Sequence, residues 1–433
     1  MNASPLRIGI AGLGTVGVSL FNVLNGHSQL ISARCGRALV VNGVNARSRD
    51  KDRGIDLSNT TWFDSATDLA NSDAIDVFVE LIGGEAGDAL AASKAALNSG
   101  KHLVTANKAM LAKHGVELAE LAEKNGLLLN FEAAVAGGIP IIKTLRESLT
   151  ANQISRIYGI LNGTCNYMLT RMEREGISYK DCLADAQRLG YAEADPTFDV
   201  EGFDTAHKLS ILASLSFGTK IEADDIYVEG ISSITNADIE AAASLGYRIK
   251  LLGVAVKTDS GIEQRVHPTM LPADSAIAQI SDVTNAVAID ADIVGSLVMS
   301  GPGAGGDATA SAVAGDISDI AKCIDGNQLV PALGRPAADL EEYKKARMRS
   351  HEGGYFIRMT VEDHAGVFAK IAKAMADQEI SLESIVQHGE ADGTKTVILI
   401  THETMEAAVR NALEEIGKDD YLSGKAQMIR IER

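Results

Sequence analysis

The chain opens with a glycine-rich turn between a predicted strand and a predicted helix. The strand covers Leu6 to Ile10, the turn places Gly12, Gly14 and Gly17 at the spacing G-x-G-x-x-G, and an apolar helical pattern covers Val18 to Leu24. In such a turn the first glycine permits a tight bend, the second lets a pyrophosphate approach the backbone, and the third lets the helix pack on the strand. This context favours dinucleotide binding over a purely structural turn. The residues that would contact the dinucleotide are Gly12, Leu13, Gly14, Thr15, Val16 and Gly17.

Four further strand patterns follow within the first 132 residues. They cover Ala38 to Val44, Asp76 to Ile82, His102 to Thr105 and Leu127 to Phe131, with helical patterns between them. Strands that alternate with helices form a parallel sheet. We therefore expect residues 1–132 to form an α/β domain with a Rossmann-type, doubly wound parallel sheet.

The rest of the chain divides into two more domains. Residues 133–325 mix longer helices with strands and predict an α+β domain, whose last helix, 308–324, would return to the first domain. Residues 326–352 carry charges and prolines and are predicted to be a linker. Residues 353–433 show the order β-α-β-β-α-β, which is typical of a ferredoxin-like domain.

Charge and cysteine content limit the partners and the location. The chain has 40 Lys and Arg against 58 Asp and Glu, a net charge of −18, so we expect no nucleic-acid partner. No apolar run approaches the roughly 18 residues of a membrane span. The four cysteines, Cys35, Cys165, Cys182 and Cys323, lie far apart without metal-ligand spacing. These features predict a cytoplasmic protein with reduced thiols, no membrane association and a small-molecule or protein partner.

A basic loop follows the second predicted strand. A carboxylate at this point would bind the ribose of NAD(H), but the chain has Asn45, Arg47, Ser48, Arg49 and Lys51 there. Guanidinium and ammonium groups would instead meet a 2′-phosphate. The loop therefore favours NADP(H), the alternative being a loop that is only a solvated surface.

An acid-rich tract spans residues 190–208. Five acids lie within the twelve residues from Glu193 to Asp204, and Asp204 and Lys208 are four apart at the start of an apolar helical pattern. The two side chains would project from one helix face. The spacing alone leaves two interpretations open: a surface ion pair, or a lysine that donates and accepts a proton.

Two other segments could carry chemistry. Lys108 follows Thr105 at the carboxyl end of the fourth strand, the edge where open α/β sheets bind ligands, although a lysine there can equally be only solvated. Glu132 and the bends at Gly137 and Gly138 could supply oxygens to a hard cation, but glycine-rich turns are more often plain connections.

Taken together, these segments resemble homoserine dehydrogenase. The resemblance rests on GLGTVG, TANK from Thr105, FEAAVAGGIPI from Phe131, ILNGTCNYML from Ile160, GYAEADPTFDVEGFDTAHK from Gly190 and GPGAGG from Gly301. It covers residues 6 to 325. The tail from residue 353 resembles an ACT domain, with DHAGV at 363–367 matching the turn where that family often binds amino acids. Both parts together are similar to the longer, regulated bacterial type of homoserine dehydrogenase.

The resemblance implies reversible, NAD(P)-dependent conversion of L-aspartate 4-semialdehyde to L-homoserine, a step toward threonine, methionine and isoleucine. The second domain would then bind substrate, carry the catalytic residues and dimerise. Lys208 would be the general acid and base, and Lys108 would assist at the carbonyl or orient the cofactor. Glu193 and Asp204 would hold the substrate, with Asp199 in support.

The resemblance also implies binding sites outside the catalytic residues. NADP(H), or alternatively NAD(H), would contact the glycine turn and Arg47, Arg49, Lys51, Thr105, Lys108, Gly190 and Gly305. A monovalent cation, expected to be sodium, would bind Glu132 and the carbonyls of Val135, Gly137 and Ile139. L-Threonine is the expected effector, at Asp363 and Gly366, and the chain is expected to form a homodimer or homotetramer.

Two other functions compete with this interpretation. One is a non-catalytic amino-acid sensor, in which an ACT module is joined to an inactive Rossmann domain. The other is an aspartate semialdehyde dehydrogenase, which needs a nucleophilic cysteine, and Cys165 would have to serve.

Overall fold

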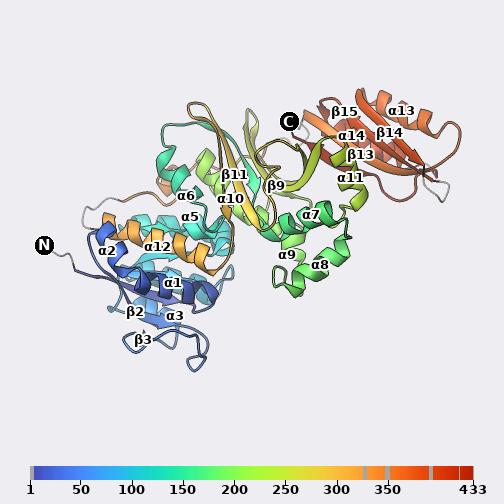
Figure 1. Cartoon of the computed structure of the whole chain (residues 1–433). Helices are drawn as coiled ribbons and strands as arrows, with labels where there is room; N and C mark the ends of the chain where they lie inside the picture. The colour runs from blue at the N-terminus through green and yellow to red at the C-terminus, as the bar shows by residue number, and fades with distance from the viewer. Residues whose placement is uncertain (1–3, 325–328, 347–351, 390–393, 419, 433) are drawn as a thin grey trace.

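The chain folds into a parallel sheet followed by a long mixed sheet that continues into the C-terminal domain (Figure 1). The computed structural model describes residues 4–324, 329–346, 352–389, 394–418 and 420–432. The N-terminal part lies at one end of the molecule and the C-terminal domain at the other (Figure 1).

The first sheet has six parallel strands in the order β3-β2-β1-β4-β5-β6. This is the strand order of a Rossmann fold, so the predicted fold class is confirmed. The strands are β1 (Leu6–Ala11), β2 (Leu39–Asn45), β3 (Thr61–Trp62), β4 (Val77–Glu80), β5 (His102–Thr105) and β6 (Leu129–Asn130). The helices are α1 (Thr15–Gly26), α2 (Ser28–Cys35), α3 (Ala66–Asn71), α4 (Asp88–Asn98) and α5 (Lys108–Lys124).

Helix α12 (Gly306–Cys323) returns from the second domain to this first sheet. It packs along α1, and Val313 and Ile317 share one buried apolar cluster with Leu20 and Leu24 (Figure 1). The first domain is therefore completed by a helix that lies almost 200 residues further along the chain than α5.

The second domain is built on a mixed sheet in the order β12-β11-β7-β9-β10. Its strands are β7 (Ile154–Ile160), β9 (Tyr247–Thr258), β10 (Gly261–Pro272), β11 (Thr284–Ala291) and β12 (Gly295–Pro302), with a short β8 (Tyr227–Val228) beside β10. Its helices are α6 (Ile141–Lys143), α7 (Gly163–Glu175), α8 (Tyr179–Arg188), α9 (Thr197–Val200), α10 (Phe203–Phe217) and α11 (Asn236–Ser244). Helix α10 packs between this sheet and α5, which brings the acid-rich tract next to the first domain.

The C-terminal domain has the predicted β-α-β-β-α-β order. Its elements are β13 (Glu352–Glu362), α13 (Val367–Asp377), β14 (Leu382–Gly389), β15 (Thr394–Thr401), α14 (Glu406–Ile416) and β17 (Gln427–Ile431), with a short β16 (Thr404–Met405). The strands lie in the order β17-β13-β15-β14, all antiparallel. The ferredoxin-like prediction is therefore confirmed.

This domain is joined to the second one more closely than the sequence predicts. Strand β17 pairs in parallel with β10, with Arg430 opposite Thr269, so the two sheets are continuous. Of the predicted linker, residues 326–328 and 347–351 lie outside the described residues. Residues 329–346 pack on the second domain, because Leu333 and Leu340 are buried and Glu341 forms a bridge with Thr219.

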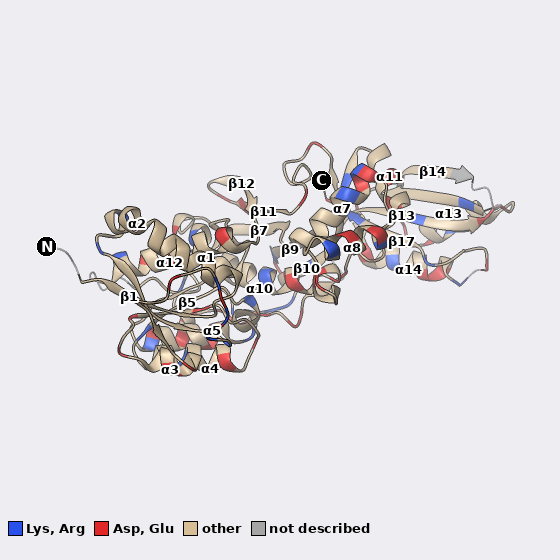
Figure 2. Ribbon diagram, turned by 60° about the horizontal axis from the view of Figure 1, so that its bottom comes forward, with Lys and Arg blue, Asp and Glu red and all other residues tan. Residues whose placement is uncertain are grey.

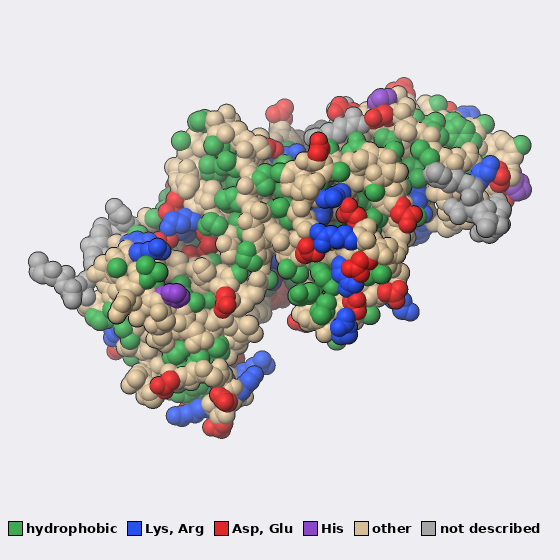
Figure 3. Space-filling view, in the orientation of Figure 1, with side chains coloured by type: hydrophobic (Ala, Val, Ile, Leu, Met, Phe, Trp, Pro, Cys, Tyr) green, Lys and Arg blue, Asp and Glu red, His purple; other side chains and the backbone are tan. Residues whose placement is uncertain are grey.

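Acidic and basic side chains are mixed over the surface. Figure 2 shows both signs along the helices, and the face in Figure 3 has no large area of a single sign. In the part of the chain that the structure describes, none of the helices combines the length and apolar character that crossing a membrane requires.

Candidate active site

The glycine turn between β1 and α1 leaves space at one glycine and none at the other two. Gly12 has a φ of +106°, and a Cβ there would lie 2.3 Å from the carbonyl oxygen of Leu81. A Cβ at Gly17 would lie 2.0 Å from the carbonyl oxygen of Gly12, whereas at Gly14 nothing lies within 4 Å. Gly12 and Gly17 are thus needed for packing, and Gly14 offers open backbone at the N-terminus of α1, where an anion is favoured. The turn fits a dinucleotide pyrophosphate.

Two later glycine-rich turns converge on this region. A Cβ at Gly137 would lie 2.5 Å from the carbonyl oxygen of Gly303, and one at Gly306 would lie 2.6 Å from Ser19 Oγ on α1. Gly305, with a φ of +110°, has open space at its Cβ position. The sequence did not reveal these contacts, because they join segments far apart in the chain.

The acid-rich tract places Asp204 between two lysines. Asp204 lies in the first turn of α10 and is 5% exposed. Its Oδ2 is 2.7 Å from Lys208 Nζ, and its Oδ1 is 3.1 Å from Lys108 Nζ. The Lys208 side chain is only 12% exposed, so the interpretation of Asp204 and Lys208 as a surface ion pair is wrong. The structure brings together both lysines that the sequence singled out.

Asn162, just before α7, connects the carboxylates of the tract. Its side-chain oxygen caps α7 by accepting the Cys165 N–H, and its amide donates to Asp199 Oδ1 at 2.8 Å and Asp204 Oδ2 at 2.9 Å. The neighbouring Leu161 carbonyl accepts a 2.7 Å hydrogen bond from Lys208 Nζ. Sequence reasoning missed these roles, although an asparagine before a helical pattern is a recognisable cap.

The two aspartates differ in their electrostatics. Burial acts to raise the pKa of the Asp204 carboxyl, but the ammonium groups of Lys208 and Lys108 outweigh it and hold that pKa well below its usual range. Burial raises the pKa of the Asp199 carboxyl, against the hydrogen bond from Asn162, and the nearby charge of Asp204 adds to the rise. Asp204 is therefore the permanent negative charge of the cluster.

The segment that precedes Lys108 is held by a hydrogen bond to the Glu80 side chain. The buried Glu80 carboxylate accepts the Gly83 N–H at 2.9 Å and the Thr105 hydroxyl at 2.5 Å. Asn107 caps α5 through the Met110 N–H, and Lys108 begins the helix. The Thr105 side chain is turned to Glu80, so any contact with a cofactor would come from its main chain.

Other predicted residues lie outside the lysine cluster. The Glu193 side chain is exposed, and within the described residues it forms no ion pair with Lys108 or Lys208. Gly190 has a φ of +76° with open space at its Cβ position.

The basic loop beyond β2 has no carboxylate at the point where the strand ends. The Asn45 amide donates to the Phe63 carbonyl at 2.9 Å, and the Asn45 carbonyl accepts the Gly12 N–H at 2.8 Å. Arg47, Arg49 and Lys51 are all exposed beyond it. The side chains expected to meet a 2′-phosphate are therefore accessible.

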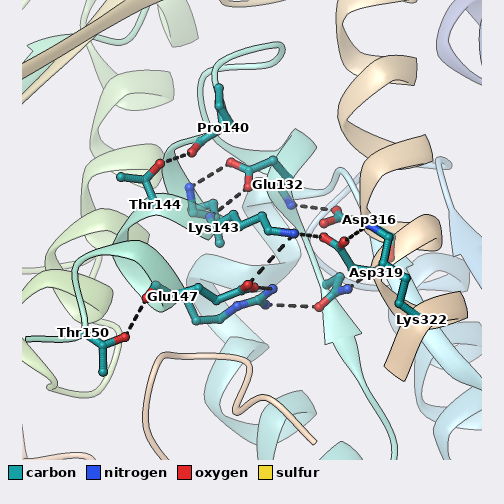
Figure 4. A network of polar contacts seen from close by, with 12 residues as sticks. Glu132, Pro140, Lys143, Thr144, Glu147, Thr150, Asp316, Asp319 and Lys322 are labelled. Carbon is teal, nitrogen blue, oxygen red and sulfur yellow. Dashed lines mark hydrogen bonds and ion pairs between the residues drawn. The ribbon is translucent and has the colours of Figure 1, made fainter. Parts of the chain in front are cut away.

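Glu132 lies in a buried polar network beside α12 (Figure 4). Its carboxylate accepts the N–H groups of Ile142 and Lys143, each at 2.8 Å, and its own N–H donates to Asp316 Oδ2 at 2.8 Å. Burial raises the pKa of both carboxyl groups. A carboxylate has about four acceptor positions, so Glu132 keeps room for a cation. Among the described residues no group of three or more His, Cys, Asp or Glu could hold a metal, so further ligands would be main-chain carbonyls.

The predicted effector turn lies at the start of α13. Gly366 precedes the helix with a φ of +95°, and Asp363 pairs with Lys395 of β15 at 2.8 Å. The turn is exposed, so an effector could reach it.

A Rossmann sheet with an open glycine turn, and a lysine–aspartate cluster at its carboxyl edge, define an oxidoreductase that uses a nicotinamide dinucleotide. Family models described as "Homoserine dehydrogenase, NAD binding domain", "Homoserine dehydrogenase" and "ACT domain" match residues 12–132, 140–318 and 355–420. The homoserine dehydrogenases of Pseudomonas aeruginosa and Neisseria gonorrhoeae are 44% and 43% identical, each over 99% of this chain and 99% of the relative. The chain belongs to the homoserine dehydrogenase family, and the resemblance seen in its sequence is confirmed.

Solved structures agree with this assignment. A homoserine dehydrogenase from Thiobacillus denitrificans aligns with a TM-score of 0.94 at 40% identity, over 100% of this chain and 99% of that one. A hyperthermophilic archaeal homoserine dehydrogenase in complex with NADPH aligns with a TM-score of 0.62 at 30% identity, over 72% of this chain and 96% of that one.

Proposed function

We propose that the chain interconverts L-homoserine and L-aspartate 4-semialdehyde, with Lys208 as the proton donor and acceptor. One observation carries this proposal: the Lys208 side chain is only 12% exposed, with one N–H on Asp204 Oδ2 and another on the Leu161 carbonyl. An ammonium group has three N–H donors. The third is left for the substrate oxygen.

The residues perform the proton transfer as follows. The nicotinamide, when bound, supplies the hydride to the aldehyde carbon or takes it from the alcohol. As negative charge grows on the aldehyde oxygen, Lys208 donates its proton there, and in the reverse direction it takes the proton from the hydroxyl. Asp204 stays ionised and fixes the lysine in place. Lys108, on the other oxygen of Asp204, polarises the same carbonyl or orients the cofactor.

The acid-rich tract binds the rest of the substrate. Asp204 already accepts hydrogen bonds from Lys208 and Asn162 and pairs with the Lys108 ammonium, so it contributes chiefly by holding these three groups in place. Of the three proposed substrate-binding carboxylates, Glu193 and Asp199 have acceptor positions to spare, and we assign them to the substrate ammonium group.

NADP(H) is the proposed cofactor, with NAD(H) as the alternative. Arg47, Arg49 and Lys51 would face the 2′-phosphate, and the solved complex of the archaeal homoserine dehydrogenase with NADPH supports this choice. Open backbone at Gly190 and Gly305, and the main chain at Thr105, would border the nicotinamide half.

A monovalent cation, proposed to be sodium, would bind Glu132 and the carbonyls of Val135, Gly137 and Ile139. The acceptor positions left on the buried Glu132 carboxylate support a cation there, and its charge would offset the cost of burying the carboxylate. Its role would be structural.

Regulation and assembly complete the proposal. L-Threonine would bind the ACT domain at Asp363 and Gly366 and lower activity, which requires that it favour one of two conformational states. The chain would work as a homodimer or homotetramer. Its four unpaired cysteines agree with a cytoplasmic location.

The competing functions are disfavoured by particular residues. A semialdehyde dehydrogenase needs a reactive thiolate, but Cys165 is fully buried and burial raises the pKa of its thiol far above the usual value. A sensor without catalysis would have no use for two lysines held on one buried carboxylate.

The test is reduction of L-aspartate 4-semialdehyde with NADPH, with the product identified by chromatography. The proposal predicts L-homoserine, formed without any requirement for phosphate. Phosphate-dependent oxidation of the semialdehyde, or no turnover by a folded sample, would contradict it.

A further inference from the structure

The guanidinium of Arg53, in the loop between β2 and β3, donates hydrogen bonds to three main-chain carbonyl groups. Its Nε donates to the Leu13 carbonyl at 3.2 Å, its Nη2 to Ser48 at 2.6 Å, and its Nη1 to Lys51 at 2.8 Å. The guanidinium also lies 5.6 Å from the ring centre of Trp62 on β3. One side chain thus joins the glycine turn, the basic loop and the sheet edge.

These contacts join the two parts of the predicted cofactor site. Leu13 lies in the glycine turn that fits the pyrophosphate, and Ser48 and Lys51 lie in the loop whose cations would meet a 2′-phosphate. Arg53 gives three of its five N–H groups to main-chain carbonyls, so its planar group is held against the backbone of the turn and the loop. Arg47 and Arg49, by contrast, are exposed and lie on the loop segment that Arg53 fixes.

We propose that Arg53 is the positioning residue that selects NADP(H) over NAD(H), because it fixes the basic loop against the glycine turn. This inference rests on the proposed preference for NADP(H). The loop has no regular secondary structure between β2 and β3. Without the hydrogen bonds of Arg53, binding a 2′-phosphate would have to order the loop backbone and the side chains of Arg47 and Arg49. That entropy cost would fall only on the phosphorylated cofactor.

The experiment compares Arg53→Met with the wild type, using calorimetric binding of 2′,5′-ADP and 5′-AMP and steady-state kinetics of homoserine oxidation with NADP⁺ and NAD⁺. We expect the Kd for 2′,5′-ADP and the KM for NADP⁺ to rise about tenfold or more. Binding of 5′-AMP, the KM for NAD⁺ and kcat at saturating NADP⁺ should change by less than about threefold. If Arg53 only stabilised the domain, the Kd and KM values for the phosphorylated and unphosphorylated ligands would rise together.

Two further variants keep the test falsifiable. Arg34→Met removes an exposed positive charge from α2 in the same domain and should leave all these values unchanged. Arg53→Lys keeps the charge but cannot bridge three carbonyls in a plane, so it should resemble Arg53→Met. If Arg53→Met fails to fold, Arg53→Lys takes its place in the same measurements.

The fluorescence of Trp62 gives an independent readout, because this is the only tryptophan in the chain. Its emission should shift in Arg53→Met and stay unchanged in Arg34→Met. If wild type binds 2′,5′-ADP no better than 5′-AMP, the NADP(H) preference fails and the role of Arg53 fails with it. If wild type prefers 2′,5′-ADP and Arg53→Met keeps that preference, only the role of Arg53 is refuted.

Discussion

Replacing Lys208 by methionine removes the proposed proton donor and leaves the rest of the cluster in place. Methionine matches the length of the lysine stem but has no N–H group. Asp204 would lose one partner and keep the ammonium of Lys108 and the amide of Asn162. Its carboxylate would thus stay partly satisfied, and we expect the variant to fold with a stability loss of about 1–3 kcal/mol.

The expected loss of turnover follows from the chemistry of the third N–H. General acid–base catalysis typically contributes about 10²–10⁴ in rate, which corresponds to about 3–5 kcal/mol of transition-state stabilisation. The glycine turn is untouched, so NADPH affinity should stay within about threefold. Initial rates of homoserine oxidation give kcat, and titration with NADPH gives the Kd.

Lys208→Arg separates proton transfer from charge. Arginine keeps a positive charge beside Asp204 but does not release its proton in proteins, so kcat should remain far below the wild-type value. A Lys208→Met enzyme with kcat within tenfold of wild type would refute the assigned role. So would a fall in NADPH affinity as large as the fall in kcat.

Three other changes test separate parts of the account. Asn162→Ala removes the amide that donates to both Asp199 and Asp204. In the same rate assay, kcat should fall about tenfold or more, with little change in the KM for cofactor. Glu406→Gln removes the carboxylate that accepts from Nε and Nη2 of the buried Arg430, which keeps Glu229 at 3.2 Å from its Nη1. The change should cost about 1–3 kcal/mol in urea unfolding at pH 7. Burial acts to raise the pKa of Glu406, but the hydrogen bonds and charges of Arg430 and Arg410 outweigh it and lower the folded-state pKa to about 2. The stabilisation from Glu406 is therefore fully present above the unfolded pKa of about 4.3. The difference in the free energy of unfolding between wild type and Glu406→Gln should therefore be constant from pH 7 to 5 and shrink as the pH falls toward 2. A difference that stays the same between pH 5 and 2 would contradict this role of Glu406. Glu132→Gln should weaken the dependence of thermal stability on sodium chloride relative to choline chloride, and an unchanged dependence would rule out the cation site.

Local patterns were enough to predict most of the fold. The glycine turn and the alternation of strands and helices indicated the parallel sheet, and the six elements of the C-terminal domain followed from periodicity. Strand β3 was missed because its two residues are too few to show the alternation of a strand. Helix α2 was missed because its sequence has little amphipathic character. The pairing of β17 with β10 joins residues 161 positions apart, such as Thr269 and Arg430, which no local pattern encodes.

The site was only partly predictable for the same reason. The i,i+4 spacing of Asp204 and Lys208 placed them on one helix face, but only packing shows that the pair is buried and shared with Lys108. The roles of Asn162 and Arg53 depend on hydrogen bonds across long stretches of chain. A sequence indicates which groups are present, and the tertiary fold determines which of them share a partner.

Oxidation of L-homoserine with NADP⁺ and with NAD⁺, each with and without L-threonine, tests the central claim most directly. We expect turnover when L-homoserine and a dinucleotide are both present, with a higher kcat/KM for NADP⁺ than for NAD⁺. L-Threonine should lower the rate. Absence of turnover with either cofactor, in a sample shown to be folded, would contradict the assignment of Lys208 and its neighbours to this reaction.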